Sequence, residues 1–516
     1  MPCSPRLACA ALTCAILGAC SSGSGEEPAE PAPPPPERGT LLAAPQPLAP
    51  LTAAELFAQA SVRSSAQLLL ELIADPECGV EVHRLRYQTV DPHDAPITSS
   101  AALMTPAGEG AACQGTRPLV VYAHGTVVER AYDIADLSDE DNVEGLLIAT
   151  AFAAQGYIVV APNYAGLGDS TLDYHPYLHA DQQSKDAVDA LEAARSALSG
   201  GAGSGVTASG ELFITGYSEG GHVAMATHRL LQESGQRVDA SAPMSGPYAL
   251  AAFGDAVFQG QVPSSAPLLF AYLVTGYQRA YGNLYTQPTE LFAAEYAADI
   301  ENILPTDGTR ADLFAQGRLP PAHLFSSTPP QPAYAPFTPA TEPAALAHVF
   351  ARGFGEQPLV ENTFRLGYLQ DAQAHPDGGF PDTTDGAPAA DPRNALRMAL
   401  KANDLRNWAP QAPVLLCAGN EDPTVLYLNT QLMQGYWSAT APAAPVEVLD
   451  VDSEPSTDDP RAPIKQAFAT AKQAVAGAAV ADGAEDGGIS AVADAYHSAL
   501  VPPFCLAAVR SFFDER

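Results

Sequence analysis

The stretch Gly-Tyr-Ser-Glu-Gly-Gly at residues 216–221 is the feature that most constrains how this chain can fold. An apolar run at residues 211–215 precedes it, and a helix-forming run at residues 222–233 follows it. A strand, a sharp turn with a serine at its apex and a helix make up the layout of a nucleophile elbow. Strand and helix nearly touch in an elbow, so glycine is favoured two residues before and after Ser218. By itself the pattern is equally compatible with an ordinary turn, because glycine and serine are common.

The composition indicates a globular protein with a strongly acidic surface. Of the 516 residues, 47% are hydrophobic and 16% are charged, which argues against a disordered chain and leaves room for more than one structural unit. The formal net charge of −34 repels phosphate backbones and argues against nucleic acid as a partner. We expect no cofactor and no metal. Asp450, Asp452, Asp458 and Asp459 could bind calcium, but a solvated acidic loop is the simpler interpretation.

The first fifty residues have the features of export and anchoring. Arg6 and the apolar run at residues 7–18 are typical of a signal peptide at residues 1–20, and the run is too short to span a bilayer. Leu-Gly-Ala-Cys at residues 17–20 looks like a bacterial lipobox, in which Cys20 becomes the lipidated N-terminus; the alternative is an ordinary signal peptide cut nearby. Residues 21–50 are rich in Pro, Ala, Glu, Ser and Gly, which predicts a tether. We therefore expect an exported protein of the bacterial cell envelope, held at the outer membrane or cell surface by a lipid, or released from it.

Strand-like and helix-like runs alternate along much of the remaining chain. Between residues 118 and 244 the alternation is typical of a parallel sheet with helices on both faces. It stops at residues 247–406, which are helical, punctuated by Pro and rich in Tyr and Phe, and it resumes at residues 407–516. The sequence thus predicts an α/β fold with a doubly wound, mostly parallel sheet. The core would span residues 51–246 and 407–516, with a helical cap inserted at residues 247–406.

The sequence also predicts helices and strands at the two ends of the core, outside the segments where strands and helices alternate. One helical segment is expected at residues 51–74, followed by paired strands at 80–90 and 97–106. Near the C-terminus, an acidic insertion at residues 450–495 is expected to contain one helix, and a closing helix is expected at residues 498–513.

Ser218 can act as a nucleophile only with a base and an orienting acid. Asp422 follows the strand-like run at residues 413–417, and a carboxylate after a strand is where an α/β-hydrolase places its acid. Glu421 is the competitor, and we favour Asp422 because the spacing Gly-x-x-Asp-x-x-Val matches. His497 is the histidine that follows the last predicted strand, so we expect it to be the base. For His175 the sequence leaves pocket lining and packing both open.

An oxyanion hole is expected from two backbone N–H groups. His-Gly-Thr at residues 124–126 closes the strand that begins at Pro118, where the backbone can approach a bound carbonyl. The N–H groups of Thr126 and Glu219 would then donate to the oxyanion, without any need for the Glu219 side chain. Together, Ser218, Asp422, His497 and this loop favour an α/β-hydrolase.

The cysteines outside the first twenty residues suggest two disulfides. Cys78, Cys113, Cys417 and Cys505 are even in number, and an exported chain would oxidise them; four buried thiols are the alternative. Cys78 and Cys113 bracket the predicted strand pair. A Cys417–Cys505 bridge would join the strand before the acid to the helix after the base.

Five motifs carry a resemblance to a known family: His-Gly-Thr at 124–126, Pro-Asn-Tyr-Ala-Gly-Leu-Gly-Asp at 162–169, His-Pro-Tyr-Leu-His-Ala at 175–180, the elbow with His222, and Tyr-His-Ser-Ala-Leu-Val-Pro-Pro-Phe-Cys at 496–505. They resemble bacterial members of the secretory lipase family of α/β-hydrolases, the lipase-A type, over most of residues 51–516. The resemblance implies a serine esterase or lipase with a helical cap over its pocket, the triad Ser218, Asp422 and His497, and a small-molecule or lipid ester as substrate.

Two other functions stay open on the sequence. A serine peptidase can have the same fold, and a surface lipoprotein without catalytic activity can keep a hydrolase scaffold.

Overall fold

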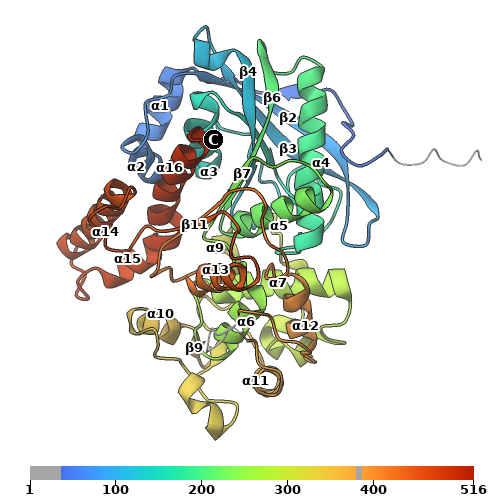
Figure 1. Cartoon of the computed structure of the whole chain (residues 1–516). Coiled ribbons are helices and arrows are strands. Elements are labelled where there is room, and N and C mark those ends of the chain that lie inside the picture. Colours follow the sequence, from blue (N-terminus) through green and yellow to red (C-terminus); the bar gives the residue numbers. More distant parts are fainter. Residues whose placement is uncertain (1–35, 379–385) are drawn as a thin grey trace, which may run out of the picture. The chain divides into compact units, whose positions relative to one another are not determined.

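A nine-stranded sheet lies at the centre of the computed structural model, which describes residues 36–378 and 386–516 (Figure 1). Its strand order is β1-β2-β3-β5-β4-β6-β7-β10-β11. The strands from β5 to β11 are parallel, whereas β1, β2 and β3 pair antiparallel. The predicted mostly parallel sheet is confirmed. The bounds are β1 Gln46–Pro47, β2 Gly79–Val90, β3 Pro96–Ala107, β4 Gly115–Ala123, β5 Ile158–Pro162, β6 Val206–Tyr217, β7 Ala240–Met244, β10 Val414–Ala418 and β11 Val446–Asp450.

Helices cover both faces of the sheet, because successive strand residues point to opposite sides. Val120 and Tyr122 of β4 pack on the side of α1, α2, α3 and α16, whereas Leu119 and Val121 pack on the side of α4 and α5 (Figure 1). The helices are α1 Ala53–Ser61, α2 Ser64–Leu70, α3 Val143–Ala151, α4 Ala180–Ser199, α5 Glu219–Glu233, α13 Leu428–Thr440 and α16 Val501–Asp514.

The N-terminal part differs from the expectation in two ways. Residues 37–50 do not belong to a tether, because β1 pairs with β2 and Leu51 forms a bridge with Val80. The compact unit accordingly begins at Glu37. The segment at 51–74 is two helices instead of one, since the backbone of Arg63 is extended between α1 and α2. The predicted signal peptide, Cys20 and the tether up to residue 35 lie outside the described residues.

A group of helices is inserted between β7 and β10. It has an apolar core of its own, and the helices lie beyond the end of the sheet where β6 meets α5 (Figure 1). Arg397 makes ion pairs with Asp255 and Asp371, both at 2.7 Å, and so joins three of these helices. The elements are α6 Leu250–Phe258, α7 Ala266–Tyr281, α8 Ala294–Ala297, α9 Arg310–Ala315, α10 Ala347–Arg352, α11 Asn362–Ala374 and α12 Ala395–Ala402, with β8 Phe325–Ser326 paired to β9 Phe354–Gly355.

The acidic stretch before His497 contains two helices, not the one expected. They are α14, Ala462–Ala481, and α15, Ile489–Ala495. The second continues through a π-helical turn, Tyr496–Leu500, into α16, so His497 lies inside a continuous helical run and not ahead of it. Among the described residues this run, Ile489–Asp514, is long and apolar enough to cross a membrane, but 72% of its most apolar window is buried, as in a core helix.

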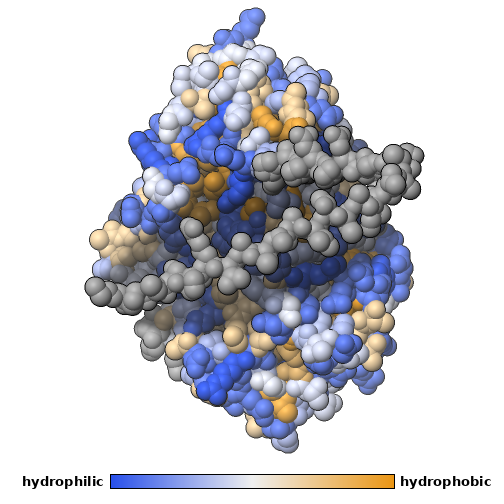
Figure 2. Space-filling model, turned by 90° about the vertical axis from the view of Figure 1, so that its right-hand side faces the viewer, coloured by the Kyte–Doolittle hydropathy of each residue, from blue (hydrophilic) through white to orange (hydrophobic). Residues whose placement is uncertain are grey.

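One face of the described surface is mainly hydrophilic. Figure 2 shows one face on which hydrophobic residues form only small scattered patches. This surface agrees with the excess of acidic residues in the sequence.

Two disulfides tie the described chain together. Cys78 is bonded to Cys113, with Cα atoms 5.5 Å apart, and the bridge encloses β2 and β3. Cys417 in β10 is bonded to Cys505 in α16, with Cα atoms 5.7 Å apart.

Removing the Cys417–Cys505 bridge should destabilise the protein more than removing Cys78–Cys113. The bridges span 88 and 35 residues, and loop-closure entropy then gives costs of about 5 and about 4 kcal/mol. Guanidinium unfolding of the two double cysteine-to-alanine variants measures both free energies, each variant serving as the control for the other. A smaller loss for the longer loop would contradict this ranking.

Candidate active site

Ser218 stands at a sharp turn between β6 and α5. Its backbone has φ 60° and ψ −120°, a region that residues other than glycine rarely adopt, so the surrounding structure must hold it there. The two glycines on either side of Ser218, Gly216 and Gly220, have no room for a side chain. A Cβ on Gly216 would lie 2.3 Å from the Gly220 carbonyl oxygen, and one on Gly220 would lie 1.9 Å from the Ala123 carbonyl oxygen. The close approach of β4, β6 and α5 therefore requires glycine at both positions.

The structure brings Ser218, His497 and Asp422 together in one hydrogen-bonded chain. His497 Nε2 lies 2.8 Å from Ser218 Oγ, and His497 Nδ1 lies 2.6 Å from Asp422 Oδ2. A carboxylate only accepts, so Nδ1 carries the proton and Nε2 accepts the hydroxyl. Asp422 is fully buried, and its other oxygen accepts the backbone N–H groups of Thr424 and Val425.

Glu421 points away from this chain. Its carboxylate pairs with Lys472 at 2.7 Å and is 42% exposed, whereas its backbone N–H donates to the Tyr496 hydroxyl at 3.2 Å. That hydroxyl also donates to Asp452, at 2.7 Å. The acidic stretch thus packs against the turn that holds Asp422 and against the residue that precedes His497.

The loop after β4 runs beside Ser218. A Cβ on Gly125 would lie 3.8 Å from Ser218 Cβ, and His124 Nδ1 donates to the Gly125 carbonyl oxygen at 2.6 Å. Thr126 follows, and its hydroxyl donates to Tyr177 at 3.0 Å. Glu219, on the other side of Ser218, is the first residue of α5, so its N–H has no acceptor within the helix.

The sequence analysis missed the contacts of two carboxylate side chains at this site. Glu144 accepts the Gly125 N–H at 3.0 Å and the Tyr122 hydroxyl at 2.7 Å, and burial raises its pKa to about 7. The Glu219 side chain, which the expected oxyanion hole does not require, accepts hydrogen bonds from His175 Nε2 and Gln183 Nε2, both at 2.7 Å. Both contacts join residues from separate elements, and no local sequence pattern signals them.

Comparison with known proteins agrees with this fold. Residues 147–234 match the model of the prolyl oligopeptidase family. The esterase LipA from Xanthomonas oryzae, described as rice cell wall degrading, has a crystal structure that is similar at a TM-score of 0.65, with 26% identity over 93% of this chain and 99% of that one. The chain is a hydrolase with the α/β-hydrolase fold. A ligand-bound form of the same esterase gives a TM-score of 0.66, with 26% identity over 93% of this chain and 100% of that chain.

A third solved structure shows the same fold. It is a putative hydrolase from Legionella pneumophila, with a TM-score of 0.59 and 20% identity over 80% of this chain and 92% of that chain. No curated protein sequence matches the hydrolase.

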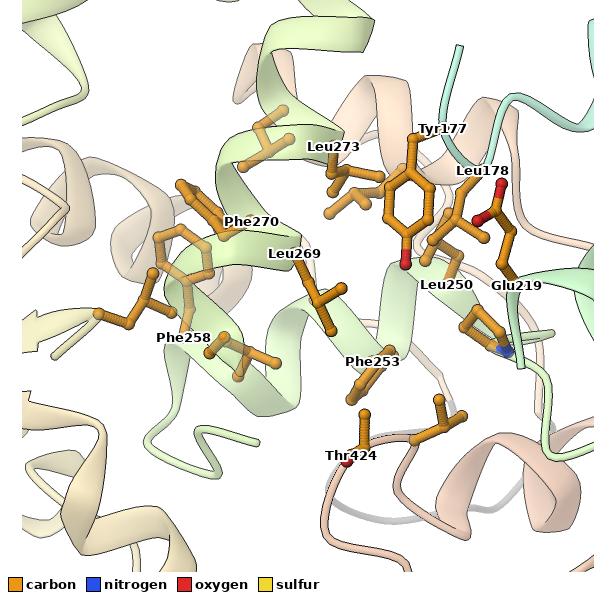
Figure 3. A pocket seen from close by; sticks show the side chains of 18 of the residues that line it. Tyr177, Leu178, Glu219, Leu250, Phe253, Phe258, Leu269, Phe270, Leu273 and Thr424 are labelled. Carbon is orange, nitrogen blue, oxygen red and sulfur yellow. The ribbon is translucent and has the colours of Figure 1, made fainter. Parts of the chain in front are cut away.

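An apolar pocket of the hydrolase opens at Ser218. It contains about 750 Å³ of space free of protein atoms, counting the open solvent at its mouth. Figure 3 shows side chains of α6 and α7 converging on it from the inserted helices. Among its described lining residues only Glu219 bears a charge. The large apolar ones shown are Leu250, Phe253, Phe258, Leu269, Phe270 and Leu273.

Within the described residues, no group of three or more His, Cys, Asp or Glu side chains is arranged to hold a metal ion. Three of the four acidic residues named as calcium candidates have protein partners. Asp450 accepts from Asn420, Asp452 pairs with Lys472, and Asp459 pairs with Lys465.

Proposed function

We propose that the protein is a serine carboxylic-ester hydrolase that acts on apolar esters through an acyl-enzyme. The observation that carries the proposal is the hydrogen-bonded chain of Ser218, His497 and Asp422 at the mouth of an apolar pocket. A serine bonded to a histidine that a buried carboxylate orients is an activated nucleophile.

The reaction follows from the positions of these groups. Ser218 Oγ attacks the ester carbonyl carbon while His497 Nε2 takes the hydroxyl proton, and Asp422 stabilises the resulting imidazolium. The carbonyl oxygen becomes an oxyanion that accepts from the N–H groups of Thr126 and Glu219. His497 then protonates the leaving alkoxide, and the acyl group stays on Ser218. Water repeats the sequence and releases the carboxylic acid.

The pocket favours an apolar acyl chain. Its described lining is almost wholly hydrocarbon and aromatic, and its one carboxylate, Glu219, already bonds to His175 and Gln183. The described lining offers no cationic partner to an anionic acyl group, and a buried charge without such a partner is costly. Medium and long chains are therefore preferred over acetate. The similarity to an esterase supports the same bond type.

A serine peptidase is the second candidate, and the match to the prolyl oligopeptidase family favours it. The matched residues, 147–234, contain α4, β6, α5 and Ser218 but neither Asp422 nor His497. These elements belong to the common fold and carry no information about the leaving group. The apolar lining of the pocket also offers few polar groups for a peptide backbone.

A panel of substrates tests the proposal. The purified protein should react with a fluorophosphonate at Ser218 and cleave p-nitrophenyl esters, while peptide p-nitroanilides should be cleaved at least 100-fold more slowly. Faster cleavage of the anilides would assign a peptidase. Absence of both labelling and turnover would leave a surface protein without catalytic activity.

We also propose that the protein is exported and anchored through a lipid on Cys20. Both described disulfides support export, because disulfides persist in oxidising compartments. Residues 17–20 support the lipid, since Leu-Gly-Ala-Cys fits a lipobox.

Cys20→Ala should abolish the incorporation of a labelled fatty acid into the protein expressed in a bacterial host. Cys14→Ala is the matched control, because Cys14 lies in the apolar run just before the lipobox and its replacement should leave labelling intact. Labelling of the Cys20→Ala variant, or a wild-type protein without lipid, would overturn the anchor.

A further inference from the structure

Glu144 joins the start of α3 to the loop that passes Ser218. It is the second residue of α3, whose first turn is already capped by the Asn142 side chain. Both Glu144 carboxylate oxygens lie 3.0 Å from the Gly125 nitrogen, and Oε1 also accepts the Tyr122 hydroxyl at 2.7 Å. An acidic residue in the first helical turn commonly stabilises its own helix. Here the carboxylate instead bonds to β4 and to the loop that follows it.

The loop lies between the carboxylate and the serine. A Cβ placed on Gly125 would be 3.3 Å from Glu144 Oε2 and 3.8 Å from Ser218 Cβ. Gly125 therefore lies close to both side chains. A shift of the carboxylate would move the loop relative to Ser218 directly.

The hydrogen bonds at Gly125 determine where the Thr126 N–H points. Glu144 fixes the peptide plane that carries the Gly125 N–H, and His124 Nδ1 fixes the Gly125 carbonyl at 2.6 Å. The Thr126 N–H belongs to the same trans peptide as that carbonyl, so it points the opposite way. Burial lowers the pKa of His124. With both planes held, the Thr126 N–H needs no reorganisation to meet an oxyanion.

We propose that Glu144 is a positioning residue that orients the Thr126 N–H toward the oxyanion. The inference rests on the proposed ester hydrolysis at Ser218. It assigns Glu144 no contact with substrate. Its effect passes through Gly125, whose backbone N–H donates to the Glu144 carboxyl group at 3.0 Å.

The experiment compares Glu144→Leu, Glu144→Gln and Tyr122→Phe with the wild type. Leucine removes the acceptor, glutamine keeps one acceptor oxygen without charge, and phenylalanine removes the hydroxyl that holds Glu144 Oε1. Glu140→Leu is the control, because Glu140 is exposed on the segment just before α3. Each variant is assayed for kcat/KM, for thermal unfolding, and for inhibition by an alkyl trifluoromethyl ketone, whose adduct with Ser218 places an oxyanion in the hole. The matching alkyl ether, which cannot react, reports pocket binding alone.

We expect Glu144→Leu to lower kcat/KM by about 100-fold, as loss of one oxyanion donor does. Affinity for the trifluoromethyl ketone should fall by the same factor, while affinity for the ether stays unchanged. Glu144→Gln and Tyr122→Phe should show smaller parallel losses, and Glu140→Leu none.

A folded Glu144→Leu variant with wild-type kcat/KM, or with reduced kcat/KM but unchanged ketone affinity, overturns the inference. If Glu144→Leu does not fold, Glu144→Gln and Tyr122→Phe decide instead. Wild-type kcat/KM and wild-type ketone affinity in both of these variants overturn the inference. A wild-type protein that neither cleaves esters nor binds the ketone refutes the proposed function instead, so the two failures are distinct.

Discussion

Ser218→Ala and His497→Ala are each expected to lower kcat for ester hydrolysis by about four to six orders of magnitude. The first removes the nucleophile, and the second removes the base that lies 2.8 Å from it. Because the three residues act as a unit, the double variant should be hardly worse than either single one. Steady-state kinetics on a p-nitrophenyl ester measures the loss, and thermal unfolding checks that both variants keep their fold.

Replacing the acid Asp422 has a matched control in the neighbouring residue, Glu421. Asp422→Ala should lower kcat strongly, because Asp422 holds His497 Nδ1 at 2.6 Å, whereas Glu421→Ala should change it little, because Glu421 pairs with Lys472. A Glu421→Ala variant more damaged than Asp422→Ala would show that the acid is assigned wrongly.

The specificity constant should rise with acyl-chain length until the pocket is filled. Each buried methylene contributes about 0.8 kcal/mol, which corresponds to about a fourfold gain in kcat/KM per added carbon. The pocket that opens at Ser218 can receive such a chain, since α6 and α7 line it with Leu and Phe side chains. The measurement is kcat/KM for p-nitrophenyl esters from acetate to palmitate. A monotonic fall from acetate onward would leave a carboxylesterase for small esters.

Narrowing the pocket should shorten the preferred chain. Leu269 points into the middle of the pocket (Figure 3), and Leu269→Trp would fill part of the channel. We expect this variant to lose the gain for long chains while keeping acetate hydrolysis. Met398→Trp is the control, because Met398 lies on α12 with 51% of its surface exposed. An unchanged chain-length profile in Leu269→Trp would place the acyl chain elsewhere.

The parts of the fold that local chemistry dictates could be predicted from the sequence. Strand-like apolar runs that alternate with helix-like runs predicted the parallel sheet and its two helical layers. The strands could be recognised because a strand buried on both faces must be apolar throughout. The turn at Ser218 could be recognised for a steric reason, since neither Gly216 nor Gly220 has room for a Cβ. The positions of Asp422 and His497 after predicted strands, together with the spacing Gly-x-x-Asp-x-x-Val around Asp422, selected both residues for the same site, and the structure places them within hydrogen-bond distance of one another.

Only the tertiary structure decided features that depend on contacts between distant segments. The Pro-rich composition around residues 37–50 hid β1, because pairing at a sheet edge depends on the neighbouring strand β2. His497 was expected ahead of a helix but lies within one, since α15 continues through a π turn whose residues Tyr496 and Leu500 are buried in the core.

Around the candidate oxyanion hole, the contact of Glu144 with Gly125 and that of His175 with Glu219 join residues 19 and 44 positions apart in the chain. Hydrogen bonds between groups so far apart in the chain require the layers to be packed first. No pattern of residue types along the chain specifies which carboxylate will then face which N–H.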